Sequence, residues 1–514
     1  MMRHTSFIIM GFFGLLLCSA LWFVISHPNV TQQSQLESSQ VTSSYEKAKK
    51  VYDDLLNSTG SGDALLYSDN LNGRIVWNEV YFMESLLNMY EATSDPRYLD
   101  IYIKHADHVL SIRDDHAGRL DYAGRLRPGW QMASYYTLGV PVIIPDKEGN
   151  PSLEVQAVHR AGNDHTLVEI LPYEGQQFTI VVRNDFRRSE PLEVVFEDLT
   201  IETVENVVNA NLTPDSWIRV RVIGKAPPVW GIWQLNETYR MVLHELHTPI
   251  IGTPFLRFSD IVFREKSLAK YMQKAEEYVH AFEESARDYE SSWRQDQDGG
   301  FFIFEPGGKY WASGLEVPYN ALSANGRFFL LLYRTTGDLR YLEKAHALAR
   351  KVRAGMVFHP DGTMTMSYWV VGSLPYTGWK NRTVDTVNGL YPECAPDQAT
   401  EDVSHFTLTL RFMVEAWQMG VVFEDEDLKA VARTFSERLW KPTPAAADEL
   451  CDPDWRKGFY LAHNLDGNSH AYDYAAATFA LLSHWDATIL NRAFEVYTSR
   501  YCDITCVDGP VRIR

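Results

Sequence analysis

The fold of this chain is indicated by a stretch that occurs twice, first as Tyr90-Glu91-Ala92-Thr93-Ser94-Asp95-Pro96-Arg97-Tyr98-Leu99. It returns as Tyr333-Arg334-Thr335-Thr336-Gly337-Asp338-Leu339-Arg340-Tyr341-Leu342, with the Tyr, Thr, Asp, Arg, Tyr and Leu in register. Each copy reads as the end of one amphipathic helix, a tight turn and the start of the next helix, which is an αα-hairpin. We expect the two aspartates to cap the second helices. Because one hairpin cannot bury its apolar faces alone, the repeat predicts an array of hairpins.

The helical pattern continues to the C-terminal part of the chain. A long helical stretch is predicted over 267–293, and two further hairpins over 404–440 and 472–501. No apolar heptad persists, so a coiled coil is not favoured. We therefore expect a mainly α fold, a closed (α/α)6-type toroid, with its first part at 44–138 and the remainder at 227–514.

Between these two parts, at 139–226, the apolar period changes. Short β-branched runs such as Leu192–Phe196 and Ile218–Ile223 are separated by Gly, Pro, Asn and Asp, a pattern typical of antiparallel strands. Several of them alternate, with one face inward and one outward. This span is predicted to be an inserted β-sandwich-like module.

The N-terminus contains an uncharged run, Ser6–Ser26. It is long enough to span the hydrocarbon core of about 30 Å and longer than the apolar region of most cleaved signals. We favour an uncleaved signal-anchor at 6–26, while cleavage after Ser26 stays open. Since Arg3 precedes the run and the next base is Lys47, residues 1–5 are expected in the cytoplasm and the bulk of the chain in the lumen or outside the cell. Residues 27–43 are rich in Ser and Gln and indicate a stalk or linker.

Glycosylation sequons and cysteines are consistent with a lumenal or extracellular location for the bulk of the chain. The sequons begin at Asn29, Asn57, Asn236 and Asn381. Outside the apolar run, four cysteines make two disulfides plausible, with three possible pairings left open. These disulfide candidates are Cys394, Cys451, Cys502 and Cys506.

Composition and motifs exclude several function classes. The net charge is −19 and no basic run is present, so no nucleic-acid partner is expected. His244 and His247 are spaced i, i+3 rather than i, i+4, and no metal site is predicted. No P-loop, dinucleotide-binding or GxSxG pattern occurs, and no cofactor is predicted. The many aromatics fit either a core or sugar-stacking platforms. The oligomeric state is not indicated.

In a toroid, the N-terminal ends of the inner helices line one mouth, so we sought acids, His and aromatics just ahead of those helices. The catalytic candidates are Glu79, Glu316, Glu401, Asp402 and His405. The substrate-binding candidates are Trp77, Tyr122, Arg125, Arg127, Trp311, Tyr319 and Asn320. Each has a structural alternative: first-turn acids complement the helix dipole, loop arginines form ordinary ion pairs, and Asp402 or Ser404 can be an N-cap.

The Thr-Gly-Asp-x-Arg-Tyr-Leu turn, the Trp-rich loops and the acid/His clusters ahead of inner helices resemble the six-hairpin (α/α)6-toroid superfamily. That superfamily contains glycoside hydrolases, polysaccharide lyases and sugar epimerases. Asp298-Gly299-Gly300-Phe301, followed by Leu315-Glu316-Val317-Pro318, is also distantly similar to the helical domain of glucuronyl C5-epimerases, which are anchored lumenal proteins. The resemblance covers 76–137 and 227–500 as a fold, and it transfers no catalytic residue.

The resulting expectation is a membrane-anchored enzyme that acts on a glycan, with uronate-containing glycans among the candidate substrates. Glycoside hydrolysis needs two carboxyl groups at the scissile bond, for which Glu79, Glu316, Glu401 and Asp402 are available. The alternative is a uronate lyase or C5-epimerase with a Tyr or His base and an Arg for the carboxylate. His405, Tyr122, Tyr319 and Arg125 are candidates for those roles. A non-catalytic glycan-binding protein is the further alternative.

Overall fold

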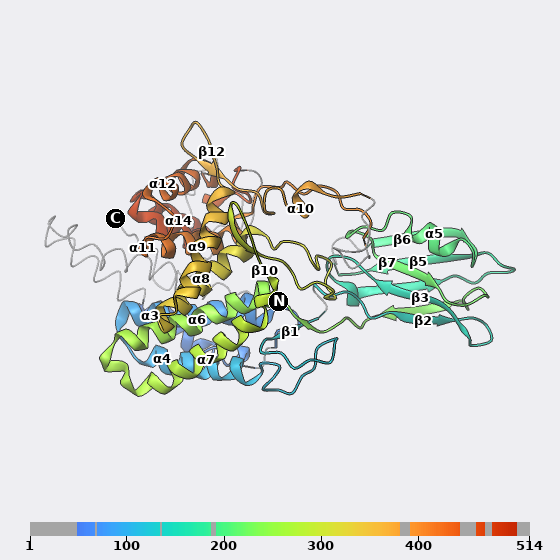
Figure 1. The fold of residues 1–514 in the computed structure, drawn as a ribbon, viewed down its shortest axis with the longest axis horizontal. Coiled ribbons are helices and arrows are strands. Elements are labelled where there is room, and N and C mark those ends of the chain that lie inside the picture. The colour runs from blue at the N-terminus through green and yellow to red at the C-terminus, as the bar shows by residue number, and fades with distance from the viewer. Residues whose placement is uncertain are drawn as a thin grey trace.

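The computed structural model describes residues 49–66, 69–133, 136–186, 192–380, 391–442, 459–467 and 475–500. It shows a helical body with a β module at one end (Figure 1). No helix within these ranges is long and apolar enough to cross a membrane. The predicted anchor at 6–26, the linker at 27–43, Asn29, Asn381, Cys451, Cys502 and Cys506 lie outside the described residues.

The two copies of the repeated turn have the same hydrogen bonds. In the first copy, Thr93 Oγ1 accepts from the amide of Asp95 at 3.1 Å, and Asp95 Oδ1 accepts from the amide of Arg97 at 3.0 Å. In the second, Thr336 and Asp338 accept from the corresponding amides at 3.2 and 2.9 Å. The residue between them is left-handed in both, Ser94 with φ 54° and Gly337 with φ 74°. The prediction that Asp338 caps the following helix is confirmed. Asp95 makes the same bond to the first helical amide, but Pro96 is the residue at the N-cap of that helix.

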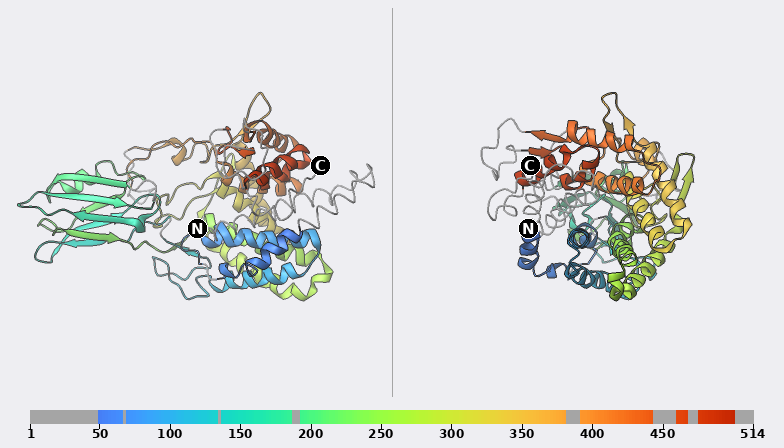
Figure 2. Two further views of the ribbon diagram at one scale, coloured as in Figure 1. Left: turned by 180° about the vertical axis from the view of Figure 1, so that it is seen from behind. Right: turned by 90° about the vertical axis from the view of Figure 1, so that its left-hand side faces the viewer.

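Five helical hairpins follow one another in the described part of the chain. Their first, inner helices are in contact in the order α3, α6, α8, α11 and α13, and Figure 2 shows them arranged around an axis. The hairpins are α3 (Val80–Thr93) with α4 (Arg97–Ser111), α6 (His244–Arg264) with α7 (Met272–Asp288), α8 (Tyr319–Thr336) with α9 (Leu339–Ala354), α11 (Val403–Gln418) with α12 (Asp425–Thr434), and α13 (Ala476–Phe479) with α14 (Thr488–Arg500). Residues 49–58 are also helical, and the Tyr52 ring packs edge-on against Tyr98 of α4.

Some boundaries differ from the sequence expectation. The stretch 267–293 is interrupted: a 3-10 turn (Lys266–Tyr271) precedes α7, and a second one (Glu290–Ser292) follows it. The helix α6 contains Pro249 and Pro254, and it is buried on nearly all sides, so it lacks the one-sided apolar pattern of a surface helix. Small residues allow close helix packing, because a Cβ on Gly326 of α8 would lie 2.2 Å from the Phe412 ring of α11.

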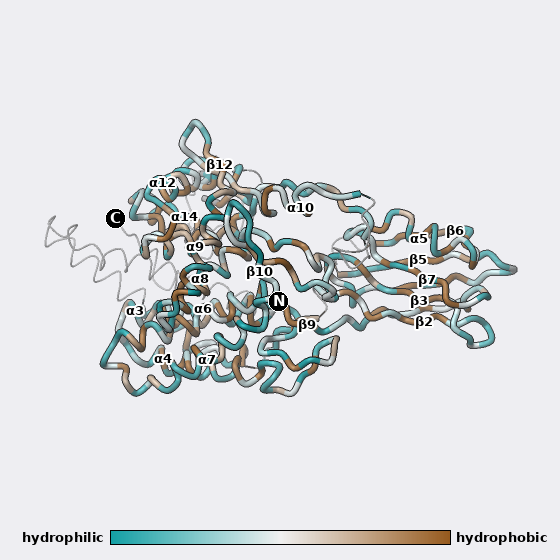
Figure 3. The backbone as a smooth tube through the Cα atoms, in the orientation of Figure 1, coloured by the Kyte–Doolittle hydropathy of each residue, from teal (hydrophilic) through white to brown (hydrophobic). Residues whose placement is uncertain are grey.

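The predicted antiparallel β module is present as two sheets that enclose their own core. One sheet has the order β2-β3-β7 and the other β6-β5-β4-β8. The strands are β2 (Val142–Pro145), β3 (Pro151–Ala157), β4 (Thr166–Ile170), β5 (Phe178–Asn184), β6 (Leu192–Leu199), β7 (Ile218–Val222) and β8 (Gly231–Leu235), with the helix α5 (Val204–Asn209) before β7. Figure 3 shows hydrophobic residues along the strands and hydrophilic ones at the turns. Since β8 pairs with β4, the module extends past residue 226.

Short two-stranded pairs connect the helices, and several lie between the helical body and the β module. They are β1 (Gln131–Met132) with β9 (Met241–Val242), β10 (Trp293–Asp296) with β11 (Gly299–Phe302), β12 (Val357–Phe358) with β13 (Met364–Thr365), and β14 (Trp440–Pro442) with β15 (Phe459–Leu461); a short helix, α10 (Leu374–Thr377), follows β13. The β module is joined to these loops through the segment after β3. There Asn163 Nδ2 donates to the carbonyl of Thr137 at 2.9 Å, and Tyr391 Oη donates to the carbonyl of Val158.

Candidate active site

The N-terminal ends of the inner helices lie at the end of the helical body that faces the β module (Figure 1). Glu79 directly precedes α3, Tyr319 and Asn320 begin α8, and Asp402 precedes α11. The structure therefore places these predicted residues at one mouth of the helical array. Their side chains, however, do not all face the same space.

Asp402 and His405 form a pair at the start of α11. Asp402 is the N-cap, and its Oδ1 accepts from the amides of Ser404 and His405 at 3.0 and 3.1 Å. Its Oδ2 accepts a hydrogen bond from the His405 ring at Nδ1. Burial alone raises the pKa of Asp402, but the bonds from His405 outweigh it and hold that pKa below its ordinary value. Asp402 is therefore an ionised carboxylate that fixes the orientation of His405.

The neighbouring Glu401 has the opposite environment. Its side chain is fully buried, and neither carboxyl oxygen has a hydrogen-bond partner among the described residues. The backbone of Glu401 is held on both sides, by the carbonyl of Met366 at 2.9 Å and the amide of Leu465 at 3.2 Å. Burial, with a smaller contribution from the charge of Asp402, raises the pKa of Glu401 well above its ordinary value. Its environment therefore favours the neutral, protonated form of the carboxyl group.

A chain of aromatic rings, here called the aromatic belt, crosses the mouth from α3 to α11. Successive ring centroids are 5.1 to 6.3 Å apart: Trp77–His247 6.2 Å, His247–Tyr136 6.0 Å, Tyr136–Tyr310 6.3 Å, Tyr310–Trp311 5.9 Å, Trp311–Trp369 5.8 Å, Trp369–Tyr368 5.1 Å and Tyr368–His405 5.2 Å. The guanidinium of Arg160, from the β module, lies 4.7 Å from the Trp311 ring centroid. The belt thus links the predicted residues Trp77 and Trp311 to His405.

His247 is one of four buried members of the belt, together with Tyr310, Trp311 and Trp369. Burial lowers its pKa to about 3, so the ring is neutral at physiological pH. Its Nδ1 lies 3.1 Å from Asn70 Nδ2; because an amide nitrogen can only donate, Nδ1 is the acceptor and Nε2 carries the proton. Within the described residues, that Nε2 has no hydrogen-bond partner. The Nε2–H group is therefore a buried donor that no described residue accepts.

Tyr319 and Glu316 lie beside the Glu401 region. The Tyr319 hydroxyl accepts from the amide of Val371 at 3.2 Å. Burial raises the pKa of Tyr319 to about 12, and the nearby carboxyls of Glu401 and Glu316 act in the same direction. Burial likewise raises the pKa of Glu316. Asn320 is also buried, and its side-chain oxygen has no partner among the described residues.

Glu79 is separated from this group. Its carboxylate is fully buried and lies 3.0 Å from His105 Nδ1 of the outer helix α4. The other ring nitrogen of His105 lies 2.9 Å from the carbonyl of Ser61. Glu79 therefore faces the outer helix layer. Its contact with His105 gives this buried carboxylate a structural role.

The loop that carries Arg125 and Arg127 is also separate from this group, and both guanidinium groups form ion pairs with carboxylates of the same chain. Arg125 pairs with Asp121 and Glu305, each at 2.7 Å. Arg127 pairs with Asp288 at 2.7 Å and with Glu305. Tyr122 donates to the carbonyl of Gly307 at 3.3 Å. These ion pairs agree with the structural alternative, in which the loop arginines form ordinary ion pairs and do not bind a substrate.

Sequence reasoning did not select five of the eight belt residues as site candidates. Tyr136, His247 and Tyr310 come from three separate loops or helix starts, and no local pattern joins them. The pair Tyr368-Trp369 was visible as an aromatic doublet after a turn, which was the one usable signal.

No family model matches the chain, and no curated protein is similar to it. Among solved structures, the chain is similar to a glycoside hydrolase family 76 protein, described as a mannosidase, from Bacteroides thetaiotaomicron VPI-5482. The identity is 11%, the TM-score is 0.37, and the match covers 94% of this chain and 88% of that one. None of these comparisons supports the resemblance to glucuronyl C5-epimerases. The likeness is too weak to assign a reaction, which has to be argued from the site's own residues.

Proposed function

We propose that this chain is a carbohydrate-active enzyme that uses the run Glu401–His405 for acid–base chemistry on a glycan. The observation that carries the proposal is the contrast between two adjacent carboxyl groups. Burial raises the pKa of Glu401 well above its ordinary value, whereas His405 and the helix amides lower that of Asp402. Two neighbouring carboxyl groups whose environments shift their pKa values in opposite directions are what a general acid and its ionised partner require.

Each of the three residues has a distinct role in this proposal. Glu401 is the general acid that protonates the leaving oxygen. His405 is the base: a carboxylate can only accept, so the bond to Asp402 places the proton on Nδ1 and leaves Nε2 as the acceptor. Asp402 is the positioning residue that fixes this tautomer. The His405 side chain is 38% exposed, which gives it access to a substrate and to water.

The substrate is proposed to lie against the aromatic belt. Aromatic rings offer an apolar face and a polar edge, which suits the faces of sugar rings. Trp77, Trp311, Tyr319 and Asn320 retain their proposed binding roles, and the donor at His247 Nε2 joins them. Arg125 and Arg127 are already paired, so a uronate in the substrate gains no support from them.

Glycoside hydrolysis is the leading reaction, with Glu401 protonating the leaving group and His405 activating water. A specific observation favours a second candidate, uronate lyase or C5-epimerase chemistry. His405 is an oriented base, and Tyr319 lies near Glu401; together they could move a proton at the carbon next to a carboxylate. Both candidates predict that His405 is essential.

We also propose that the bulk of the chain is lumenal or extracellular, anchored by residues 6–26. Asn57 and Asn236 are exposed, as glycosylation requires. Cys394 is a buried free thiol, so no disulfide is proposed for it. Glycosidase treatment of the purified protein, followed by mass spectrometry, tests the location.

The functional experiment incubates the protein with neutral and uronic-acid polysaccharides and uses three readouts. New reducing ends report hydrolysis, ultraviolet absorbance of an unsaturated product reports a lyase, and deuterium incorporation at C5 reports an epimerase. Glu401→Gln and His405→Ala should each abolish the readout seen with the wild type. Glu426→Gln, at an exposed carboxylate on α12, is the matched control and should not change it. Retained glycan binding without turnover in the wild type would instead support the non-catalytic alternative.

A further inference from the structure

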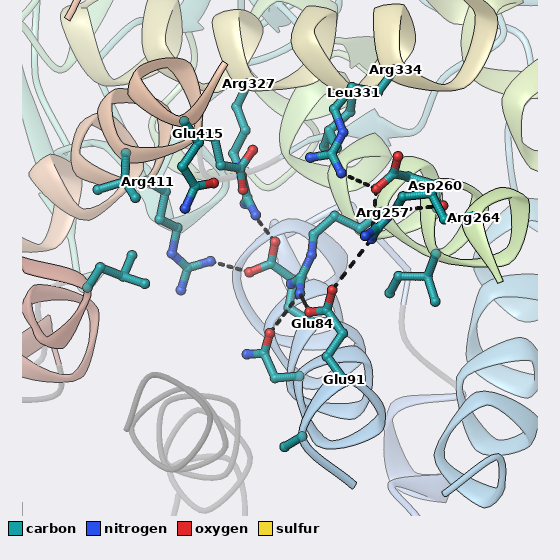
Figure 4. Close-up of a pocket in the computed structure, with 16 residues that line it drawn as sticks. Glu84, Glu91, Arg257, Asp260, Arg264, Arg327, Leu331, Arg334, Arg411 and Glu415 are labelled. Carbon is teal, nitrogen blue, oxygen red and sulfur yellow. Dashed lines mark hydrogen bonds and ion pairs between the residues drawn. The ribbon is translucent and has the colours of Figure 1, made fainter. Parts of the chain in front are cut away.

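A polar cavity lies at the end of the inner helices that is away from the β module. Its volume is about 360 Å³, and it is lined by the C-terminal halves of α3, α6, α8 and α11. Figure 4 shows charged side chains from these four helices converging on it. Arg264, whose side chain is 55% exposed, lies at its solvent-facing rim. None of the residues proposed for the active site lines it.

Five arginines and four carboxyl groups line this cavity, a formal surplus of one positive charge (5 − 4) in a chain whose net charge is −19. Its positive residues are Arg257, Arg264, Arg327, Arg334 and Arg411, and its acids are Glu84, Glu91, Asp260 and Glu415. Most of them are paired. Glu84 accepts from Arg327 at 2.7 Å and from Arg411, and Glu415 accepts from Arg327 at 2.8 Å.

Some buried polar atoms of the same side chains are not paired within the described part of the chain. Arg411 is 4% exposed, and its Nε and Nη2 have no acceptor. Asn88 Nδ2 has no acceptor, and Glu415 Oε2 has no donor. Leaving a buried donor without a partner is costly, more so for a charged group. The cavity therefore presents three unsatisfied donors, one unsatisfied acceptor and a surplus positive charge.

We propose that this cavity binds a small oxyanion that carries at least one hydroxyl group. The oxyanion's acceptor oxygens would satisfy Arg411 and Asn88, and its charge would neutralise the surplus. The hydroxyl would donate to Glu415 Oε2, which a fully deprotonated anion cannot do. Monohydrogen phosphate and a hydroxy-carboxylate share this chemistry, and arginine forks suit both. The inference does not depend on the proposed enzymatic function.

Calorimetric titration of the full protein with inorganic phosphate, sulfate and glucuronate at pH 7.5 tests the site. It also distinguishes a phosphate ligand from a hydroxy-carboxylate ligand. Phosphate and sulfate are both tetrahedral dianions, but only phosphate retains a hydroxyl at this pH. The site predicts binding of phosphate or glucuronate that is at least about tenfold tighter than that of sulfate, the difference expected for one hydrogen bond to a charged group. Equal binding of all three, or no binding at millimolar concentration, would overturn the proposal.

Two near-isosteric variants locate the site. Asn88→Asp keeps the acceptor that Arg257 uses at 2.9 Å but removes the free donor and adds a negative charge, so binding should weaken by more than about tenfold. Glu415→Gln replaces the free acceptor with a donor and should reverse the preference in favour of sulfate. Gln177→Glu, on an exposed loop of the β module, introduces the same charge as Asn88→Asp and should change nothing. Unchanged affinities in both cavity variants would contradict the location.

If either variant fails to fold, a crystal of the wild-type protein soaked in arsenate locates the bound oxyanion. Anomalous density between Arg411 and Asn88 is expected. Density elsewhere, or none, would refute the assignment.

Discussion

Replacement of Glu84 by Gln should destabilise the helical body by an amount that the structure allows us to estimate. Glu84 is buried on α3 and pairs with Arg327 of α8 and Arg411 of α11. Burial opposes its ionisation, but these arginines outweigh that effect and lower the pKa of Glu84 from 4.5 to about 2. At 1.36 kcal/mol per pKa unit, this difference is worth about 3 kcal/mol. Removing one partner of a buried ion pair costs about 3–5 kcal/mol, which agrees.

The sign of the pH dependence follows from the lowered pKa. The stabilisation is fully present above about pH 4.5, the value in the unfolded chain, and is lost as the pH falls through about 2. The difference in unfolding free energy between the wild type and Glu84→Gln should therefore shrink from about 3 kcal/mol at pH 7 to about 1 kcal/mol at pH 3.

Urea unfolding followed by far-ultraviolet circular dichroism at both pH values measures this difference. Glu91→Gln is the control on the same helix, since Glu91 also pairs with an arginine but its side chain is 38% exposed. That variant should lose less than about 1 kcal/mol. A Glu84→Gln variant within 1 kcal/mol of the wild type at pH 7, or a loss that does not change with pH, would refute the reasoning.

Three further changes test the packing and the turns. Ser94→Gly should raise the unfolding free energy by about 0.5–1 kcal/mol and Gly337→Ser should lower it by a similar amount, because both positions are left-handed; shifts of the same sign in urea unfolding would be inconsistent with this. Gly326→Ala should lower the unfolding free energy by about 1–3 kcal/mol, since its Cβ would lie 2.2 Å from the Phe412 ring. An unchanged midpoint of urea unfolding would show that α8 and α11 have room for the added methyl group. The Cys394 thiol, 6% exposed, should react with a thiol reagent only on unfolding, and Cys394→Ala should remove one reactive thiol from the unfolded protein; immediate reaction of Cys394 in the native protein would contradict its burial.

The hairpins could be predicted because their signal is local. A Thr and an Asp two residues apart bond to the turn amides in both copies of the repeat, so the repeat marked two hairpins from the sequence alone. The helix α6 gave a weaker signal. Its two prolines oppose a helix assignment, and burial on nearly all sides removes the periodicity that would mark one face.

For the candidate site too, the residues that could be predicted are those with a local sequence signal. Glu401, Asp402 and His405 are adjacent in sequence, and a cap followed by a helix brings Asp402 and His405 together. Glu79 shows the opposite case. It too precedes an inner helix, but it lies in a π-helical turn, Ile75–Glu79, and its carboxylate meets His105 on the outer layer. Sequence spacing gives the position of a side chain along a helix and does not give the layer that it faces.

Long-range partners lay beyond the reach of sequence reasoning. Arg127 is paired with Asp288 and Glu305, which are remote in sequence, so the cluster of arginines indicated a free cationic patch where the structure has ion pairs. The arginine-rich cavity was not predicted, since its wall is made by four helices. Only the packing of the hairpins brings those residues together.

The most direct test of the proposed acid–base site is the pH profile of turnover for the wild type and Glu401→Gln, on the glycan that the wild type converts fastest. The raised pKa of Glu401 predicts that the wild type loses its activity as rising pH deprotonates this acid, and that this loss occurs at a higher pH than an ordinary carboxyl group would give. Glu401→Gln should be slower by at least about 100-fold, the contribution of one general acid, and should lack that alkaline limb. A Glu401→Gln enzyme with the turnover and pH profile of the wild type would contradict the assignment.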